Sequence, residues 1–217
     1  MRSLLKRGHL AAAAAVLLLL PAVARSTVVI QPSLEEMTQK SNVIIHAVVE
    51  EQTVTRGEEG KRILTLSRLR VTEGLKGAKT GDTITLYQVG GSEGGRVARV
   101  VGMNDFKVGE EVILFAATFI ATDTIRFLQE NRKAEVPAAT LHPSGGWVVT
   151  YGIGLGKFAV VPGPNGSGPM AVEEVGDVAV ARQVQGRVMA GTPVVNRQPL
   201  DAFKAEVRRM ASTGRAP

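Results

Sequence analysis

Short stretches in which apolar and polar residues alternate, separated by glycine-rich turns, recur along most of this chain and constrain its fold. From Val43 to Val49 every second residue is apolar, which is typical of a β-strand with one buried face. A glycine-bounded turn at residues 57–60 then predicts a hairpin into a second strand. The expected strands cover residues 43–55, 61–71, 83–89, 95–102, 111–120, 124–129, 147–151 and 157–161. Strands of this number and spacing predict a mainly β fold, either an antiparallel barrel or a sandwich.

The second of these strands changes the face on which its apolar residues lie. Leu64 and Leu66 share one face, whereas Leu69 and Val71 share the other. A β-bulge near Ser67 would reconcile the two halves and bend the strand. Because a long bent strand allows a small sheet to close on itself, we expect a closed or partly open antiparallel β-barrel.

Helical signals are confined to the two ends of this pattern. Ser33 and Glu36 form a capping box, which predicts a short N-terminal helix over residues 32–40. Between residues 199 and 211, apolar residues recur at helical spacing and predict an amphipathic C-terminal helix. They are Leu200, Phe203, Val207 and Met210. Prolines and glycines at residues 162–169 predict a loop or the base of a hairpin before that helix.

The first residues have the features of a secretory signal peptide. Three cations precede an unbroken apolar run over residues 10–20, and Ala22 and Ala24 then form the small-x-small pattern of a signal-peptidase site. We expect cleavage after Ala24, so that residues 1–24 are removed and the protein is exported to the periplasm or the extracellular space. An uncleaved anchor is the alternative, but the apolar run falls short of the roughly 20 residues that span a bilayer.

Composition excludes several classes of protein. The 217 residues are 44% hydrophobic and 21% charged, which is typical of a globular chain. The formal net charge is +6, but three of the cations lie in the predicted leader, so the rest of the chain carries only +3. A charge this small, together with 4% aromatic residues, does not indicate a nucleic-acid surface. The chain contains no cysteine, which excludes disulfides, thiolate metal sites and a cysteine nucleophile.

One serine lies in a pattern associated with hydrolases. Residues 90–94 (Gly-Gly-Ser-Glu-Gly) fit the G-x-S-x-G elbow, in which Ser92 would be the nucleophile. The elbow requires a helix after the turn, whereas the following residues have the pattern of a strand. The base would have to be His142, which lies in a predicted turn. We therefore expect a glycine-rich hairpin loop at this position, with no catalytic residue.

Two further patterns suggest cofactor or metal chemistry, and each has a structural explanation. Residues 152–157 (Gly-Ile-Gly-Leu-Gly-Lys) resemble a phosphate-binding glycine loop, but residues 158–161 favour a strand where that loop needs a helix. Two histidines outside the leader supply too few ligands for a typical zinc site, and His46 is expected to be structural. No nucleotide, metal or other cofactor is expected.

The order of these elements resembles an uncharacterised family of exported bacterial proteins. Residues 71–77 fit the layout V-x-x-x-L-K-G, residues 106–115 fit F-x-x-G-E-x-V-x-x-F, and residues 154–158 read Gly-Leu-Gly-Lys-Phe. This layout is similar in turn to the netrin-like domain of tissue metalloproteinase inhibitors, which is an OB-type barrel. The resemblance spans residues 33–161. Those inhibitors bind zinc through an N-terminal cysteine, which this chain lacks, so the resemblance implies a fold and no activity.

Together these features predict three segments and a general role. Residues 1–24 form the signal peptide, 25–161 the barrel, and 162–217 a Pro/Gly-rich hairpin with a C-terminal helix packed on the barrel. The protein is expected to be a non-enzymatic binding protein whose partner is a protein or a cell-envelope component. The alternatives are a protease inhibitor that acts through a barrel-edge loop and a hydrolase that uses Ser92. The residues expected to be structural are Lys76, Gly77, Phe106, Gly109 and Phe115.

Overall fold

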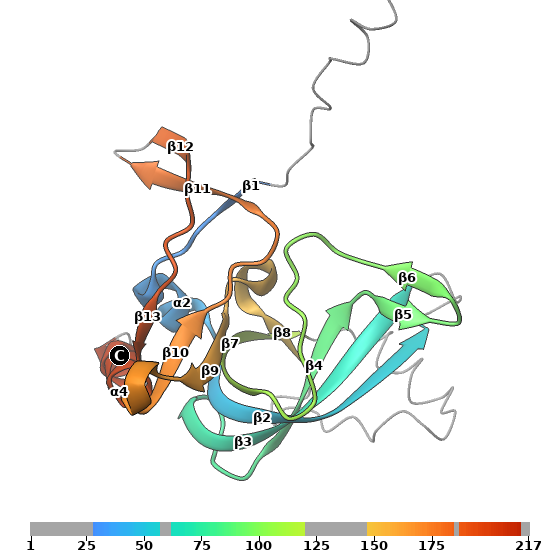
Figure 1. The fold of residues 1–217 in the computed structure, drawn as a ribbon, viewed down its shortest axis with the longest axis horizontal. Helices are drawn as coiled ribbons and strands as arrows, with labels where there is room; N and C mark the ends of the chain where they lie inside the picture. Colours follow the sequence, from blue (N-terminus) through green and yellow to red (C-terminus); the bar gives the residue numbers. More distant parts are fainter. Residues whose placement is uncertain (1–27, 57–61, 120–146, 185–186, 214–217) are drawn as a thin grey trace, which may run out of the picture.

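The computed structural model describes residues 28–56, 62–119, 147–184 and 187–213 (Figure 1). The α-helices of the described residues are α2 (Leu34–Lys40) and α4 (Leu200–Thr213). The strands are β1 (Val28–Ile30), β2 (Val43–Arg56), β3 (Ile63–Lys76), β4 (Thr83–Val89), β5 (Gly91–Glu93), β6 (Arg96–Ala98), β7 (Glu111–Phe119), β8 (Trp147–Thr150), β9 (Lys157–Pro162), β10 (Pro169–Glu173), β11 (Ala179–Val184), β12 (Arg187–Gly191) and β13 (Arg197–Pro199). Two 3₁₀ turns are η2 (Tyr151–Gly154) and η3 (Pro164–Gly166). The predicted signal peptide, the turn at residues 57–60, the strand at residues 124–129 and His142 lie outside the described residues.

Five strands close into a β-barrel, as the sequence predicted. β2 pairs with β3 on one side and with β7 on the other, and β3 continues into an antiparallel pair with β4. β8 closes the ring, because it pairs in parallel with β4 and antiparallel with β7. The order around the barrel is therefore β2-β3-β4-β8-β7.

The inside of the barrel is filled by alternate residues of these strands. In β2 the inward residues include Val43 and Ile45, and in β7 they include Val112 and Leu114, all with no exposed surface. They belong to one cluster with residues from β3, β4 and β8. The period-2 pattern of the sequence therefore corresponds directly to the buried face of each strand.

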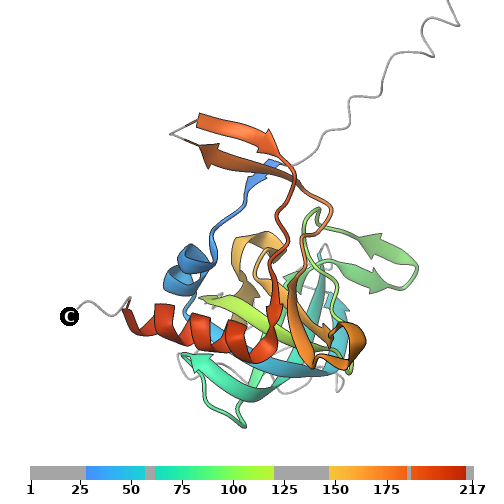
Figure 2. The same ribbon diagram turned by 60° about the vertical axis from the view of Figure 1, so that its left-hand side comes forward.

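The helices α2 and α4 lie on the same side of the barrel and cover a second apolar core there (Figure 2). Residues of β2 and β7 that point away from the barrel interior, such as Ile44 and Phe115, pack against them. Phe203 of α4 places its ring centroid 6.2 Å from that of Phe115 and 4.7 Å from that of Phe158 in β9. β7 is thus covered on both faces, which explains its nearly continuous apolar sequence.

The sheet continues beyond the barrel through β9, β10 and β13. β9 and β10 form the hairpin expected at residues 162–169, and Gly163 N donates to Gly168 O at its end. Two smaller sheets are separate from the barrel sheet: the hairpin β5–β6, and a three-stranded sheet in the order β1-β11-β12. We call the three-stranded sheet the arm, because it stands away from the barrel (Figures 1 and 2).

The expected bulge near Ser67 is wrong in its position. Ser67 pairs regularly with Gln52, and the register between β2 and β3 shifts elsewhere. One shift skips Glu50 of β2, and two more skip Thr72 and Leu75 of β3. β3 itself pairs without interruption from Ile63 to Val71, so Leu64 and Leu66 lie on the opposite face from Leu69 and Val71. Both pairs are buried, and the change of face therefore needs no extra residue in β3.

Two element boundaries also differ from expectation. The strand expected at residues 95–102 is only β6, because a turn begins at Val100, whose carbonyl accepts from Met103 N. The N-terminal helix begins at Leu34, two residues later than expected, because Ser33 is its N-cap and accepts from Glu36 N at 3.1 Å. The Glu36 carboxylate binds Lys40 at 2.7 Å, and so the capping box is only half formed.

We expect Phe115→Ala to lower the free energy of unfolding by about 3–5 kcal/mol, as for other buried aromatic truncations. The reason is the cavity it opens between β7, β9 and α4, where Phe115 is fully buried. Urea titration followed by tryptophan fluorescence measures the effect. Val108→Ala is the control, because Val108 is 62% exposed and its loss should cost less than about 0.5 kcal/mol. Equal midpoints for the two variants would contradict the covered position of β7.

Candidate functional site

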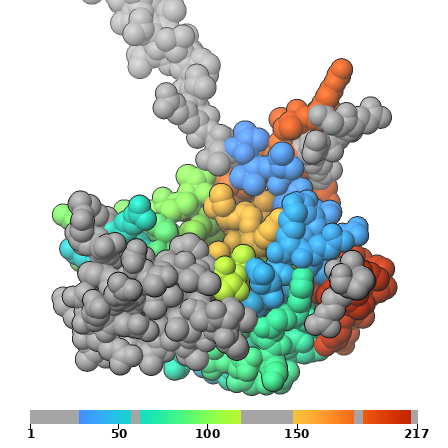
Figure 3. Space-filling model, turned by 180° about the vertical axis from the view of Figure 1, so that it is seen from behind, coloured from blue at the N-terminus to red at the C-terminus, as the bar shows by residue number. Residues whose placement is uncertain are grey.

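The arm rises from one edge of the molecule (Figure 3). β1 pairs in parallel with β11, and β11 pairs antiparallel with β12 without any shift of register. The parallel pair brings the first described residues beside a strand that lies about 150 positions later in the sequence.

One face of the arm carries large exposed apolar side chains around Ala181, which is buried. The pairing aligns Ile30 with Ala181, and Ala181 with Ala190, so that these side chains lie on the same face. Val28 and Val188 lie on this face by the alternation of their strands. The exposed fractions are 58% for Val28, 49% for Ile30 and 60% for Val188.

The opposite face of β12 carries Arg187 and Met189, and Met189 is 56% exposed. The sequence around these residues is basic, because residues 178–199 contain three arginines and no acidic residue. All five residues of β12 are exposed. No strand of the described chain pairs with the outer edge of β12, so its backbone groups on that side remain available to another strand.

A buried carboxylate holds the base of the arm. Glu173 of β10 is 5% exposed, and it accepts from Gln31 Nε2 and from Asn196 N, each at 3.1 Å. The Gln31 amide also donates to Val194 O at 2.8 Å and accepts from Val194 N at 3.1 Å. Burial raises the pKa of Glu173, and the hydrogen bonds from Asn196 and Gln31 oppose that rise. Glu173 therefore links two of the three segments that join the arm to the rest of the molecule, those containing Gln31 and Asn196.

A buried lysine lies beside it at the end of the barrel. Lys157 is 1% exposed, and its Nζ lies 2.6 Å from Glu110 Oε1, 2.8 Å from Glu174 Oε2 and 2.7 Å from Asp105 O. The same ammonium lies 4.6 Å from the centre of the Phe106 ring. All three hydrogens of the ammonium therefore have acceptors, and no donor remains for a ligand.

The cavity next to Lys157 has a volume of about 520 Å³ and is lined by charged side chains of both signs. Most of these charges are already paired, since Arg99 binds Asp177 at 2.8 Å and Lys157 binds Glu110 and Glu174. We therefore regard this cavity as part of the connection between the arm and the barrel.

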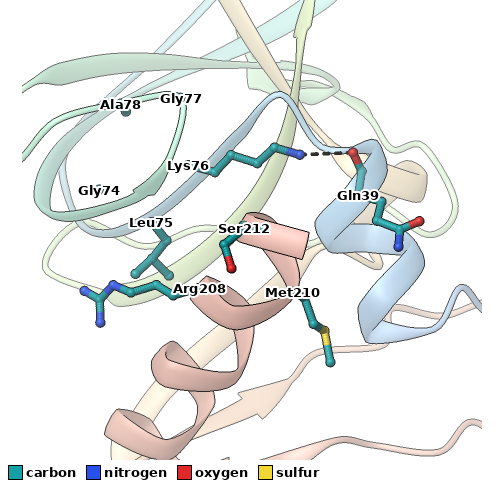
Figure 4. Close-up of a pocket in the computed structure, with 10 residues that line it drawn as sticks. Gln39, Gly74, Leu75, Lys76, Gly77, Ala78, Arg208, Met210 and Ser212 are labelled. Atoms are coloured by element: carbon teal, nitrogen blue, oxygen red, sulfur yellow. Dashed lines mark hydrogen bonds between the residues drawn. The ribbon is translucent and has the colours of Figure 1, made fainter. Parts of the chain in front are cut away.

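A second cavity, of about 400 Å³, lies between the end of β3 and the helices α2 and α4 (Figure 4). Lys76 reaches across it and donates to Thr38 O at 2.8 Å and to Gln39 O at 3.0 Å. It thereby satisfies carbonyl groups at the C-terminal end of α2, and burial lowers its pKa. Arg208 on the opposite wall is bound to Glu73. Both cations hold structural contacts, so the cavity does not offer them to a ligand.

The other residues expected to be structural lie at turns and in the two cores. Gly77 has a φ of +69°, and a Cβ there would lie 2.1 Å from Asn42 O. Gly109 has a φ of +86° in the turn before β7, where its N–H donates to Val49 O. Phe106 is 5% exposed and belongs to the barrel core, whereas Phe115 faces α4.

The motifs that suggested chemistry are not brought together. Ser92 is exposed in the hairpin β5–β6 and is followed by a strand, so its surroundings lack the helix of a nucleophile elbow. Residues 152–157 lead through η2 into β9, again without a helix. His46 is 7% exposed with its Nε2 2.7 Å from Glu111 Oε1, and desolvation lowers its pKa despite that carboxylate.

No protein-family model, curated protein or solved structure matches this chain. Across residues 28–56, 62–119, 147–184 and 187–213, no group of His, Cys, Asp or Glu side chains is arranged to hold a metal ion. Within the same ranges, neither helix has the length and apolar character needed to cross a bilayer. The netrin-like resemblance of the sequence therefore stays a prediction.

Sequence reasoning missed the arm, Glu173 and Lys157. The arm had a local signal, because two apolar stretches flank Gln185 and Gly186, and a two-residue connection of this kind is typical of a hairpin. Lys157 had no such signal, because its partners Glu110 and Glu174 lie 47 and 17 positions away in the sequence.

We expect Lys157→Met to lower the free energy of unfolding by about 3 kcal/mol, because it leaves two neighbouring carboxylates without their cation. This value is the lower end of the range for a broken buried pair, since Glu174 keeps solvent contact. Lys107→Met, at an exposed position on the rim of the same cavity, is the control. Adding Glu110→Gln to Lys157→Met should recover part of the loss in urea titrations, and no recovery would contradict the pairing.

The stability of wild type should fall relative to Glu173→Gln as pH rises above the ordinary glutamate pKa of about 4.5. A raised pKa in the folded state means that the folded protein binds more protons than the unfolded chain in this range, so stability is lost as pH rises. Urea titrations between about pH 4 and about pH 8 measure the difference in the free energy of unfolding between wild type and Glu173→Gln. A difference that does not change with pH would show that the Glu173 carboxylate is solvated.

Proposed function

We propose that this chain is an exported, non-enzymatic binding protein, periplasmic or extracellular, that holds a protein or cell-envelope partner through the arm. The charged, apolar and small-residue pattern of residues 1–24 supports export. The exposed apolar residues of the arm support binding, since contiguous apolar surface on a folded domain is typical of an interaction site.

The same proposal assigns the barrel to the OB type, similar to the netrin-like domain. Five strands in the order β2-β3-β4-β8-β7, with β4 and β8 parallel, support that assignment, because an OB fold is a five-stranded barrel with a non-sequential strand order. In this arrangement the barrel is a rigid base on which the arm is displayed.

The observation that carries the proposal is the clustering of exposed apolar residues on the arm and its connection. Val28, Ile30, Val188 and Met189 are each about half exposed, and Val194 and Val195 follow at 55% and 50%. The hairpin β5–β6, by contrast, exposes only one large apolar side chain, Val97, at 77%. Single exposed residues are common on protein surfaces and indicate no partner.

Photo-crosslinking tests the proposal. A benzoylphenylalanine residue in place of Val188 should form adducts when the purified mature protein is mixed with the envelope fraction of the bacterium that encodes it. The same residue in place of Val97 is the matched control, because both positions are exposed on short strands. Adducts at position 188 and none at position 97 are expected. Equal labelling at both positions, or none at either, would refute the arm as the binding surface.

A further inference from the structure

We propose that the outer edge of β12 takes up an extended peptide strand whose side chains alternate between apolar and acidic. This inference rests on the proposed role of the arm as the binding surface, and it specifies the chemistry of the partner. It follows from the edge of the sheet, from the two rows of side chains on β12 and from the charge of the arm.

The first step concerns the edge itself. Exposed edge strands are usually protected by proline, by bulges, by inward charges or by a covering element. β12 contains no proline, its register with β11 is continuous, and its five residues are all exposed. The outer strand of the larger sheet, β13, has only three residues, ends in Pro199 and runs directly into α4. Among the described strands, β12 is therefore the edge best suited to accept another strand.

The second step concerns the side chains of a strand added there. Its residues would alternate between the two faces of the arm, and each would lie beside its neighbour on β12. On one face the neighbours are Val188, which pairs with Gln183, and Ala190, which continues the row of Ala181 and Ile30. On the other face the neighbours are Arg187, Met189 and Gly191. Acidic residues opposite and diagonal to Arg187 lie within reach of its guanidinium, so an added strand is accommodated best if its side chains alternate between apolar and acidic.

The third step concerns charge and decides between possible occupants. The strands of the arm contain two arginines, Arg182 and Arg187, and no acidic residue, so two copies of the arm would bring like charges together. An acidic strand meets the opposite charge. An anionic lipid surface would also attract the arginines, but acyl chains leave the free backbone groups of an edge strand without partners. The peptide strand is the occupant that satisfies both the charge and the backbone.

A binding titration tests this inference. The probe is a fluorescein-labelled peptide with three Val-Glu repeats, added to the mature protein and followed by fluorescence anisotropy. Two matched peptides accompany it: one has lysine in place of each glutamate, and one has N-methyl groups on alternate amides. We expect binding of the Val-Glu peptide only, because the first control reverses the charge and the second removes backbone hydrogen bonds along one edge.

Charge reversal in the protein provides the complementary test. Arg187→Glu should weaken binding of the Val-Glu peptide by about tenfold and create binding of the Val-Lys peptide. Arg96→Glu, at an exposed position of β6, is the matched control and should change neither. Circular dichroism checks that both variants are folded.

Each other outcome overturns the inference. If the lysine peptide binds as tightly as the Val-Glu peptide, recognition by charge is contradicted. If the N-methyl peptide binds as tightly, strand addition is contradicted. Dimerisation measured by light scattering, or binding to phosphatidylglycerol vesicles, in a protein that ignores the Val-Glu peptide would assign the edge to a second copy or to lipid. If no peptide binds but crosslinking at position 188 still gives adducts, the proposed function stands and only this partner chemistry fails.

Discussion

β7 is the strand on which the rest of the structure depends, because it is buried on both faces. Val112 and Leu114 contribute to the barrel core, while Ile113 and Phe115 pack beneath α2 and α4. β7 also pairs with β2, β8 and β9, so it closes the barrel and begins the extension of the sheet. A strand with one solvated face could not join two cores in this way.

The charged groups at the end of the barrel decide how the arm is attached. Lys157 lies in β9, its partner Glu110 precedes β7, and Glu174 follows β10, so one ammonium joins three parts of the extended sheet. Glu173, the residue before Glu174, binds two of the three segments that join the arm to the rest of the molecule. The arm is thus attached next to two buried charged side chains, Lys157 and Glu173, which favours a fixed orientation for its exposed strands.

How far the sequence could predict the fold is clearest in β2 and β3. The alternation from Val43 to Val49 predicted both the strand and its inward face. The change of parity between Leu66 and Leu69 does not mark a bulge in β3, because this strand is regular there and both of its faces are buried. The candidate site was not predicted, since the arm depends on a parallel pairing between β1 and β11, which are far apart in the chain.

The sequence by itself determined the strands of the barrel, the two helices and the turn positions at which glycine is required. These features follow from local periodicity and backbone sterics, which involve residues only a few positions apart. Only the tertiary structure decided that Lys157 and Glu173 are buried, and that β12 is a free edge among the described strands. Burial and strand neighbours depend on segments that are distant in the chain, and no pattern within a single segment encodes them.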